Sequence, residues 1–268
     1  MEQQIKTKIE AIGTPLKEWD INIYRGILTG FNAAFIVDDK KKNELVAADP
    51  KSAEIIRPIL SGKNIKRYQF SWENKWIIFT RRGINIDQYP AIKAHLQTDY
   101  DNLRPRNNNE PTGRKPGSYK WFEIQDNVAY FEDFDKQKIA WGNLALKGQF
   151  ALVDEGYYIN APSSFIATDQ IYLIAILNSQ LADFYIKQLG VTRNGGYFEY
   201  KPMFVEQLPI PKISQNVADR LLVLIEKLKE KPLLKIQTEI EINNIVNSLY
   251  DITEDERQFI YNSASLIN

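Results

Sequence analysis

The feature that most constrains the fold is a change of pattern near residue 214. Before this point, apolar runs are short, as in "KWIIFT" at 75–80, which Arg81, Arg82 and Gly83 follow, and "KIAWGN" at 138–143. After it, apolar residues recur at helical spacing in two stripes, at 217–228 and 236–249. The pattern predicts an α+β body over residues 1–214 and a C-terminal helical hairpin or small bundle over residues 215–268.

Within the body, the pattern predicts individual elements. Residues 19–37 read as strand, loop and strand, residues 75–80 as a strand, and residues 138–143 and 150–168 as β-structure. Helices are expected at 49–62, 88–103 and 169–190, and a capping box formed by Thr253 and Glu256 is expected to start a last short helix. The segment 104–120, "RPRNNNEPTGRKPGSYK", is rich in residues that break regular structure, which predicts a long functional or disordered loop.

Composition excludes several kinds of site. The chain has no cysteine and one histidine, His95, so cysteine nucleophiles, disulfides and histidine-rich metal sites are ruled out. The lack of cysteine suits a reducing compartment, and no apolar stretch is long enough to span a membrane, so we expect a cytoplasmic protein without a membrane partner. The net charge is 0, but six basic and nine acidic residues fall in 215–268, which gives the tail −3 and residues 1–214 +3.

Signatures of catalysis are mostly missing. We find no phosphate-binding loop, no nucleophile elbow, no dinucleotide fingerprint and no adenine-methyltransferase N-P-P-[YF] motif. Glu73 and Lys75 fit the E-x-K half of a metal-dependent nuclease signature, but such a site also needs an acidic partner to hold Mg²⁺. A polar turn before the strand is the simpler reading of these residues, and His95 reads as an ordinary residue on a helix surface.

Basic or amide side chains accompany glycine or aromatic residues in four loops. Glycines let backbone N–H groups approach a phosphate, and arginine and asparagine can read base edges. The four sets are Arg25, Thr29, Gly30 and Asn32; Lys63, Lys66, Arg67 and Tyr68; Arg104, Arg106, Arg114, Lys115, Lys120 and Trp121; and Arg193, Asn194, Gly195, Gly196 and Tyr197. Arg81 and Arg82 follow the strand at 75–80. Together these residues predict contacts with DNA if they share one face of the molecule.

Two motifs resemble a known family. "YRGILTGFNAAFIVD", then "IIRPILSGKNIKRY" and a strand such as "WIIFT", resemble the C-terminal specificity domain of TaqI-like DNA methyltransferases and of fused restriction-modification enzymes. The later segments "IAWGN", "SSFIAT", "YLIAILNSQLADFYI" and "EQLPIPK" resemble the rest of such domains, and also the target recognition domains of type I specificity subunits. The resemblance covers roughly residues 13–268.

The resemblance implies a DNA target recognition domain over residues 1–214, with a curved mixed or antiparallel sheet, that grips double-stranded DNA and reads the major groove. It implies no catalytic residues, metal or cofactor in this chain. In the family, a separate catalytic domain holds S-adenosylmethionine and flips out the target adenine. The chain would therefore be part of a larger DNA methyltransferase or restriction enzyme, in keeping with phage defence, or a separate specificity subunit.

The resemblance leaves two questions open. "RGILTG" could support the scaffold or contact the DNA backbone, and base reading is then expected from 81–83, 104–121 and 192–197. The competing hypotheses are a protein-interaction module that docks a partner through the stripes at 217–249, and a Mg²⁺-dependent nuclease that uses Glu73 and Lys75.

Overall fold

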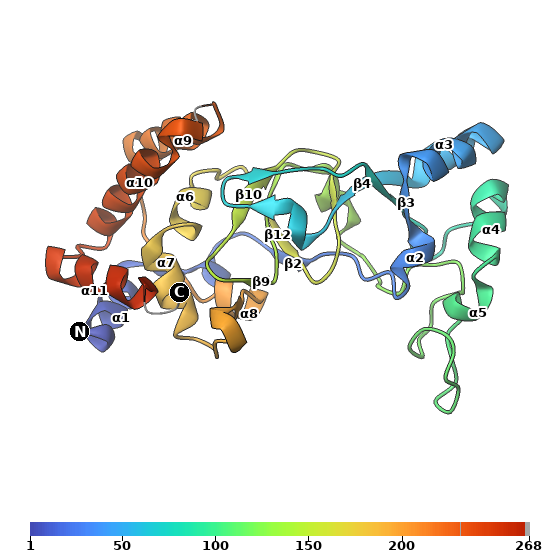
Figure 1. Cartoon of the computed structure of the whole chain (residues 1–268), viewed down its shortest axis with the longest axis horizontal. Helices are drawn as coiled ribbons and strands as arrows, with labels where there is room; N and C mark the ends of the chain where they lie inside the picture. The colour runs from blue at the N-terminus through green and yellow to red at the C-terminus, as the bar shows by residue number, and fades with distance from the viewer. Residues whose placement is uncertain (231, 266–268) are drawn as a thin grey trace.

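Helices occupy both ends of an elongated molecule, and strands lie between them (Figure 1). The computed structural model describes residues 1–230 and 232–265, so residue 231 and residues 266–268 of the predicted C-terminal segment lie outside the described residues. Long helices and α1 gather at one end, and α2 to α5 lie at the other. The α+β fold class is confirmed.

Two sheets of four strands each form the middle of the described chain. The first has the order β10-β8-β12-β2 and is antiparallel throughout, with strands β2 (Ile23–Arg25), β8 (Lys138–Trp141), β10 (Phe150–Val153) and β12 (Ser164–Ala167). The second has the order β11-β4-β7-β3, with strands β3 (Ile36–Asp38), β4 (Ile56–Leu60), β7 (Lys75–Ile78) and β11 (Tyr158–Ile159). β11 runs parallel to β4, and the other pairs in this sheet are antiparallel.

Three smaller antiparallel pairs complete the β-structure of the described residues. They are β1 (Thr14–Pro15) with β14 (Pro209–Ile210), β5 (Ile65–Lys66) with β6 (Gln69–Phe70), and β9 (Leu144–Ala145) with β13 (Phe198–Glu199). The first pair joins segments almost two hundred residues apart, because Thr14 faces Ile210. The pairing of β1 with β14 therefore holds the beginning and the end of the body together.

The first sheet separates two hydrophobic cores. Side chains along a strand alternate between faces, so Ile139 and Trp141 point into one core and Ala140 into the other. The core around Ala140 also holds Phe35 of α2 (Asn32–Phe35) and Ile92 of α4 (Pro90–Gln97). Helices α3 (Asp39–Ala48) and α5 (Tyr100–Leu103) complete that end of the molecule.

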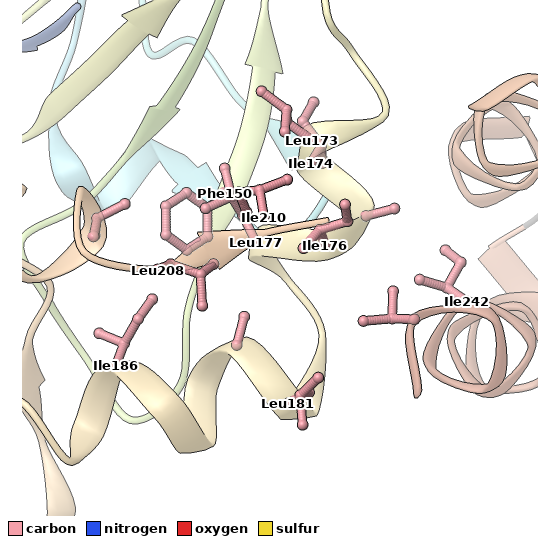
Figure 2. Close-up of a cluster of buried hydrophobic side chains, with 14 of the residues drawn as sticks. Phe150, Leu173, Ile174, Ile176, Leu177, Leu181, Ile186, Leu208, Ile210 and Ile242 are labelled. Atoms are coloured by element: carbon pink, nitrogen blue, oxygen red, sulfur yellow. The ribbon is translucent and has the colours of Figure 1, made fainter. Parts of the chain in front are cut away.

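The other core is helical on one side. Figure 2 shows Ile186 of α7 (Gln180–Lys187) and Leu177 of α6 (Leu173–Leu177) turned toward Phe150 and Ile210, and Leu181 of α7 belongs to the same core. The remaining helices of this end are α1 (Glu2–Ile12), α8 (Pro202–Val205), α9 (Gln215–Glu230), α10 (Lys235–Leu249) and α11 (Glu254–Ser265). None of the helices in the described residues combines the length and apolar content that a membrane span requires.

The C-terminal stripes pack against the chain's own body. Leu221 and Ile225 of α9, and Ile242 and Val246 of α10, are buried in the same core as Ile174. Ile236 and Ile240 of the second stripe are exposed, 80% and 47%, so docking of a partner stays a prediction for this part of α10. The capping box is confirmed: the Thr253 N–H donates to the Glu256 carboxylate at 2.8 Å, and the Glu256 N–H donates to the Thr253 hydroxyl at 3.4 Å.

Two helix predictions need correction. Residues 49–62 form a 3-10 turn, η2 (Pro50–Ile55), followed by strand β4, which pairs with β7. The helix expected over 169–190 is divided into α6 and α7, because the Asn178 side chain hydrogen-bonds the Phe150 backbone N–H and C=O at 3.0 and 2.8 Å. Ser179 then caps α7 by accepting from the Ala182 N–H at 3.1 Å.

Candidate nucleic-acid interface

The glycines of "RGILTG" serve close packing. A Cβ at Gly26 would lie 2.6 Å from the carbonyl oxygen of Ile159, and the Gly26 N–H donates to the Ser163 carbonyl at 2.7 Å. Gly30 has φ +81°, and a Cβ there would lie 2.5 Å from the Gln125 side chain. Both positions therefore favour glycine for packing, which supports the scaffold reading at these two residues, and contact of this loop with the DNA backbone stays a prediction.

Thr29 is also a supporting residue. It is fully buried, and its hydroxyl donates to Asn32 at 2.7 Å and accepts from the Phe31 N–H at 3.1 Å. The burial of Thr29 counts against its prediction as a DNA contact. Gly30 is exposed, so its backbone stays a predicted contact. Asn32 is exposed at the start of α2 and stays a predicted contact.

Arg114 holds the long loop in place from inside. It is 3% exposed, and burial lowers its pKa to about 10. Its five N–H groups donate to backbone carbonyls: Nε to Leu103 (2.6 Å), Nη1 to Thr29 (2.7 Å) and Glu123 (2.8 Å), and Nη2 to Lys120 (3.2 Å) and Trp121 (3.0 Å). Arg114 cannot reach DNA in this arrangement, so its prediction as a contact is corrected to a structural role.

Arg25 and Arg82 are tied to the segment that follows the long loop. The Arg25 guanidinium donates to both oxygens of Asp126 at 3.0 Å, and Asp126 also accepts from the Leu28 N–H at 3.0 Å. Arg82 donates to the Gln125 carbonyl at 2.8 Å and to the Ser118 hydroxyl at 3.1 Å. The loop 25–32, the arginines after β7 and the long loop are thus brought together by tertiary contacts.

The Tyr119 ring contacts two of the arginine side chains in this region. The guanidinium carbons of Arg114 and Arg82 lie 4.3 and 5.2 Å from the centre of its ring. Burial raises the pKa of the Tyr119 phenol, and the positive charges of Arg114, Arg82 and Arg106 oppose that rise. We refer to Arg25, Arg81, Arg82, Arg106 and Arg114 as the arginine cluster.

Arg81 differs from its neighbours in what it contacts. Its guanidinium lies over the ring of Phe131, 3.8 Å from the ring centre, and the side chain is exposed. Phe131 starts the 3-10 turn η5 (Phe131–Asp135), and the preceding Tyr130 donates its hydroxyl to the Arg25 carbonyl at 2.7 Å. Arg25 and Arg81 therefore flank one short segment.

The rest of the long loop presents cations to solvent. Lys115 and Lys120 are exposed, and Trp121 is half-buried in edge-to-face contacts with Tyr100 and Phe122. Arg104 is less available, because it pairs with Glu110 at 2.6 Å. In Figure 1 this loop extends from α5 beyond the body of the molecule.

The second predicted set lies elsewhere. Arg67 donates to the carbonyl oxygens of Asn178 at 2.7 Å and Gly148 at 3.1 Å, and to Glu239 of α10 at 2.8 Å. With 11% of its side chain exposed, it links the body to the C-terminal helices, and its prediction as a DNA contact is corrected. Lys66 is exposed, and Lys63 pairs with Glu73 at 2.6 Å.

The 192–197 loop is only lightly held. Arg193 is 60% exposed and pairs with Glu199 at 3.0 Å, and Asn194 and Tyr197 are exposed. Gly195 and Gly196 both have positive φ, +73° and +77°, which supports a turn that other residues rarely adopt. This loop joins α7 to β13, so the fourth set stays a predicted interface separate from the arginine cluster.

The nuclease hypothesis finds no supporting geometry. Glu73 is bound to Lys63, which helps to hold its pKa below the usual value. Residues 1–230 and 232–265 contain no group of three or more acidic or histidine side chains that could hold a metal ion. His95 is engaged with the Ala34 carbonyl through Nε2 at 3.0 Å, which is a packing contact.

Sequence reasoning missed the segment 123–131 on which the cluster rests. Asp126 and Phe131 carry no motif, and their role depends on the loops that fold against them. The available signal was the pair of aromatic residues at 130–131, which follows a mixed polar and apolar stretch.

Comparison with known proteins places this geometry in a family. A model of the TaqI-like C-terminal specificity domain matches residues 57–210, more than half of the chain. The fold is similar to the type IIL restriction-modification enzyme MmeI, whose structure was determined in complex with DNA (12% identity, TM-score 0.68, 95% of this chain and 36% of that one). It is also similar to the type IIG restriction endonuclease BpuSI (11% identity, TM-score 0.50, 93% of this chain and 32% of that one).

The chain thus spans about a third of each of these enzymes, and at such identities the likeness concerns the fold alone. No curated protein sequence matches it. The specificity-domain match covers most of the arginine cluster and the 192–197 loop, which supports a role in DNA target recognition. The chain belongs to the family of TaqI-like C-terminal specificity domains of restriction-modification enzymes.

Proposed function

We propose that this chain recognises a specific sequence in double-stranded DNA for a larger restriction-modification enzyme. The observation that carries the proposal is the specificity-domain match over residues 57–210, which includes the exposed cations of the long loop. The loop at 192–197 falls in the same range and supplies a second contact region.

Charge and exposure at the arginine cluster support this function. Arg81, Arg106, Lys115 and Lys120 have no ion pair within the described residues, so their charges are available to a polyanion. Exposed lysines and arginines bind phosphates by releasing condensed counterions, and guanidinium groups can also read base edges. A chain with net charge 0 can therefore bind DNA through a local basic excess.

Catalysis is assigned to a part of the enzyme outside this sequence. We propose that a methyltransferase domain or subunit, with S-adenosylmethionine as its cofactor, modifies an adenine in the recognised site, in the cytoplasm. The contribution of this chain is then to bind the duplex and to hold it in register for that partner. Base flipping and methyl transfer would take place in the partner.

The test is a binding titration of the chain against a randomised duplex pool at low and at physiological salt, with the bound sequences read out. Specific recognition predicts enrichment of a short motif and a steep fall of affinity with salt. The double variant Lys115→Ala/Lys120→Ala should weaken binding to all sequences and reduce the slope of log affinity against log salt by roughly 2.

The matched control is Lys212→Ala/Lys229→Ala, which removes the same charge from exposed positions outside the loop. This control should bind as the unaltered chain does. Absence of binding at low salt, or equal losses in the two double variants, would count against DNA recognition by this face.

A further inference from the structure

Arg81 and Arg82 are adjacent in sequence but are held in different ways. They begin a turn after β7, in which the Ile84 N–H donates to the Arg81 carbonyl at 3.2 Å and Gly83 has φ +80°. The turn directs the two side chains to different partners. Arg82 bonds the Gln125 carbonyl and Ser118, whereas Arg81 lies on Phe131. Arg82 therefore supports the fold, and the Arg81 side chain is exposed to solvent.

The Arg81 guanidinium is held by an aromatic ring, and its N–H groups remain available as donors. The Phe131 ring, 3.8 Å from the guanidinium carbon, restricts where the group can lie, yet within the described residues the Arg81 side chain makes no hydrogen bond or ion pair. An aromatic ring beneath a guanidinium leaves its N–H edge free, in a fork that matches two acceptors side by side. A phosphate contact would need the charge but not this restricted orientation.

The space around Arg81 can admit a base edge. Arg81 borders a cavity of about 320 Å³ that is shared with Arg57, Gly83 and Tyr89. A Cβ at Gly83 would meet no atom within 4 Å, so the backbone beside Arg81 is open to an approaching duplex. Glu54 and Asp135 also line the cavity; Glu54 accepts from the Tyr89 hydroxyl at 3.1 Å, and neither carboxylate pairs with Arg81.

We propose that Arg81, held by Phe131, reads a guanine in the major groove of the target through its O6 and N7 atoms. These two acceptors lie on the major-groove edge of guanine, and adenine replaces one of them with a donor. The inference rests on the proposed DNA-recognition function and assigns one base and one residue within it. Phe131 acts as a positioning residue, because it reduces the conformational freedom that Arg81 would lose on binding.

The test repeats the selection from a randomised duplex pool with the unaltered chain, Arg81→Ala, Arg81→Lys and the control Arg220→Ala, an exposed arginine of α9. Both changes at position 81 should reduce the preference for guanine at one position of the motif by about 5- to 150-fold, and other positions should be unchanged. Lysine keeps the charge but lacks the fork, so its failure to restore the preference separates base reading from charge. Arg220→Ala should select the original motif.

A chemically altered base gives an independent measurement. Replacement of that guanine by 7-deazaguanine removes the N7 acceptor, so it should weaken binding by the unaltered chain and leave binding by Arg81→Ala unchanged. Phe131→Leu should reduce the guanine preference by a smaller factor than Arg81→Ala. Thermal unfolding of each variant checks that these changes reflect contact and not misfolding.

Three results would overturn the inference. A uniform loss of affinity with Arg81→Ala, with a salt slope reduced by about 0.9, would show a phosphate contact. A retained guanine preference in Arg81→Lys would show that charge is sufficient. An unchanged motif in Arg81→Ala would show no contact, while DNA recognition by the chain would stand. If the unaltered chain selects no DNA, the proposed function fails and this inference fails with it.

Discussion

Two loop regions of this chain look alike in sequence but differ in structure. The loops at 25–32 and 104–120 and the loop at 192–197 all combine arginine, glycine and asparagine. In the first region, Arg114 and Thr29 are buried, and the Arg114 guanidinium donates to carbonyl oxygens of three segments. In the second, the Arg193 side chain is exposed and pairs with Glu199. The comparison shows that a basic, glycine-rich loop can be an internal brace or an exposed surface.

The largest expected effect comes from removal of the internal brace. Arg114→Met keeps the bulk of the side chain but leaves five buried carbonyl groups without their donor. Loss of one partner from a buried charged network is expected to cost about 3–5 kcal/mol in the free energy of unfolding. Urea unfolding should detect this change, and Arg193→Met should cost below about 1 kcal/mol because its pair is exposed. Equal losses in the two variants would refute the distinction between the regions.

A smaller effect is expected at the glycines. Gly26→Ala would place a Cβ 2.6 Å from a backbone oxygen, so the strands around it must shift, at a cost of about 1–3 kcal/mol. Gly195→Ala meets no atom closer than 3.7 Å and carries only the cost of a positive φ, about 1 kcal/mol. Thermal unfolding compares the stability lost to a steric clash in Gly26→Ala with the stability lost to a positive φ in Gly195→Ala. A larger loss at Gly195 would mean that the 192–197 loop is more tightly packed than its contacts indicate.

The smallest effect is expected at the two carboxylates that hold these arginines. Asp126→Ala removes acceptors for Arg25 and for the Leu28 N–H, which should cost about 1–2 kcal/mol. Glu199→Ala removes exposed pairs with Arg193 and Lys201, which should cost below about 1 kcal/mol. Chemical denaturation of both variants in parallel measures which one loses more free energy of unfolding. The double variant checks whether the two losses add. The reverse order would show that the exposed pairs contribute more than their exposure suggests.

The sequence predicted elements where one periodicity was strong and local. The helices of the C-terminal segment, the Thr253 capping box and the strand at 75–80 follow from patterns within a few turns of chain. The helix expected at 49–62 was wrong because Ile55, Ile56, Ile59 and Leu60 fit helical spacing, although Pro58 cannot continue a helix and isoleucine favours strands. Pairing of β4 with β7 decided the outcome.

The site was less predictable than the fold for a physical reason. Composition identified Arg81 and Arg114 equally, but the carbonyl groups that bury Arg114 come from residues 29, 103 and 120–123. Only the assembled fold brings these segments together, so no local pattern distinguishes a buried arginine from an exposed one. The stack of Arg81 on Phe131 joins residues fifty positions apart and escaped prediction for the same reason.

The closure of the fold by its first helix has a consequence for synthesis. Ile5 and Ile9 of α1 are fully buried, Thr14 pairs with Ile210, and Lys8 pairs with Glu256 at 2.7 Å. The partners of α1 therefore leave the ribosome some 200–250 residues later, roughly 10–50 s at ordinary elongation rates. During that interval these pairings of α1 and β1 cannot form. The segment that carries α1 therefore waits longer for these partners than a segment that pairs with its sequence neighbours, which prolongs its exposure to chaperones and proteases.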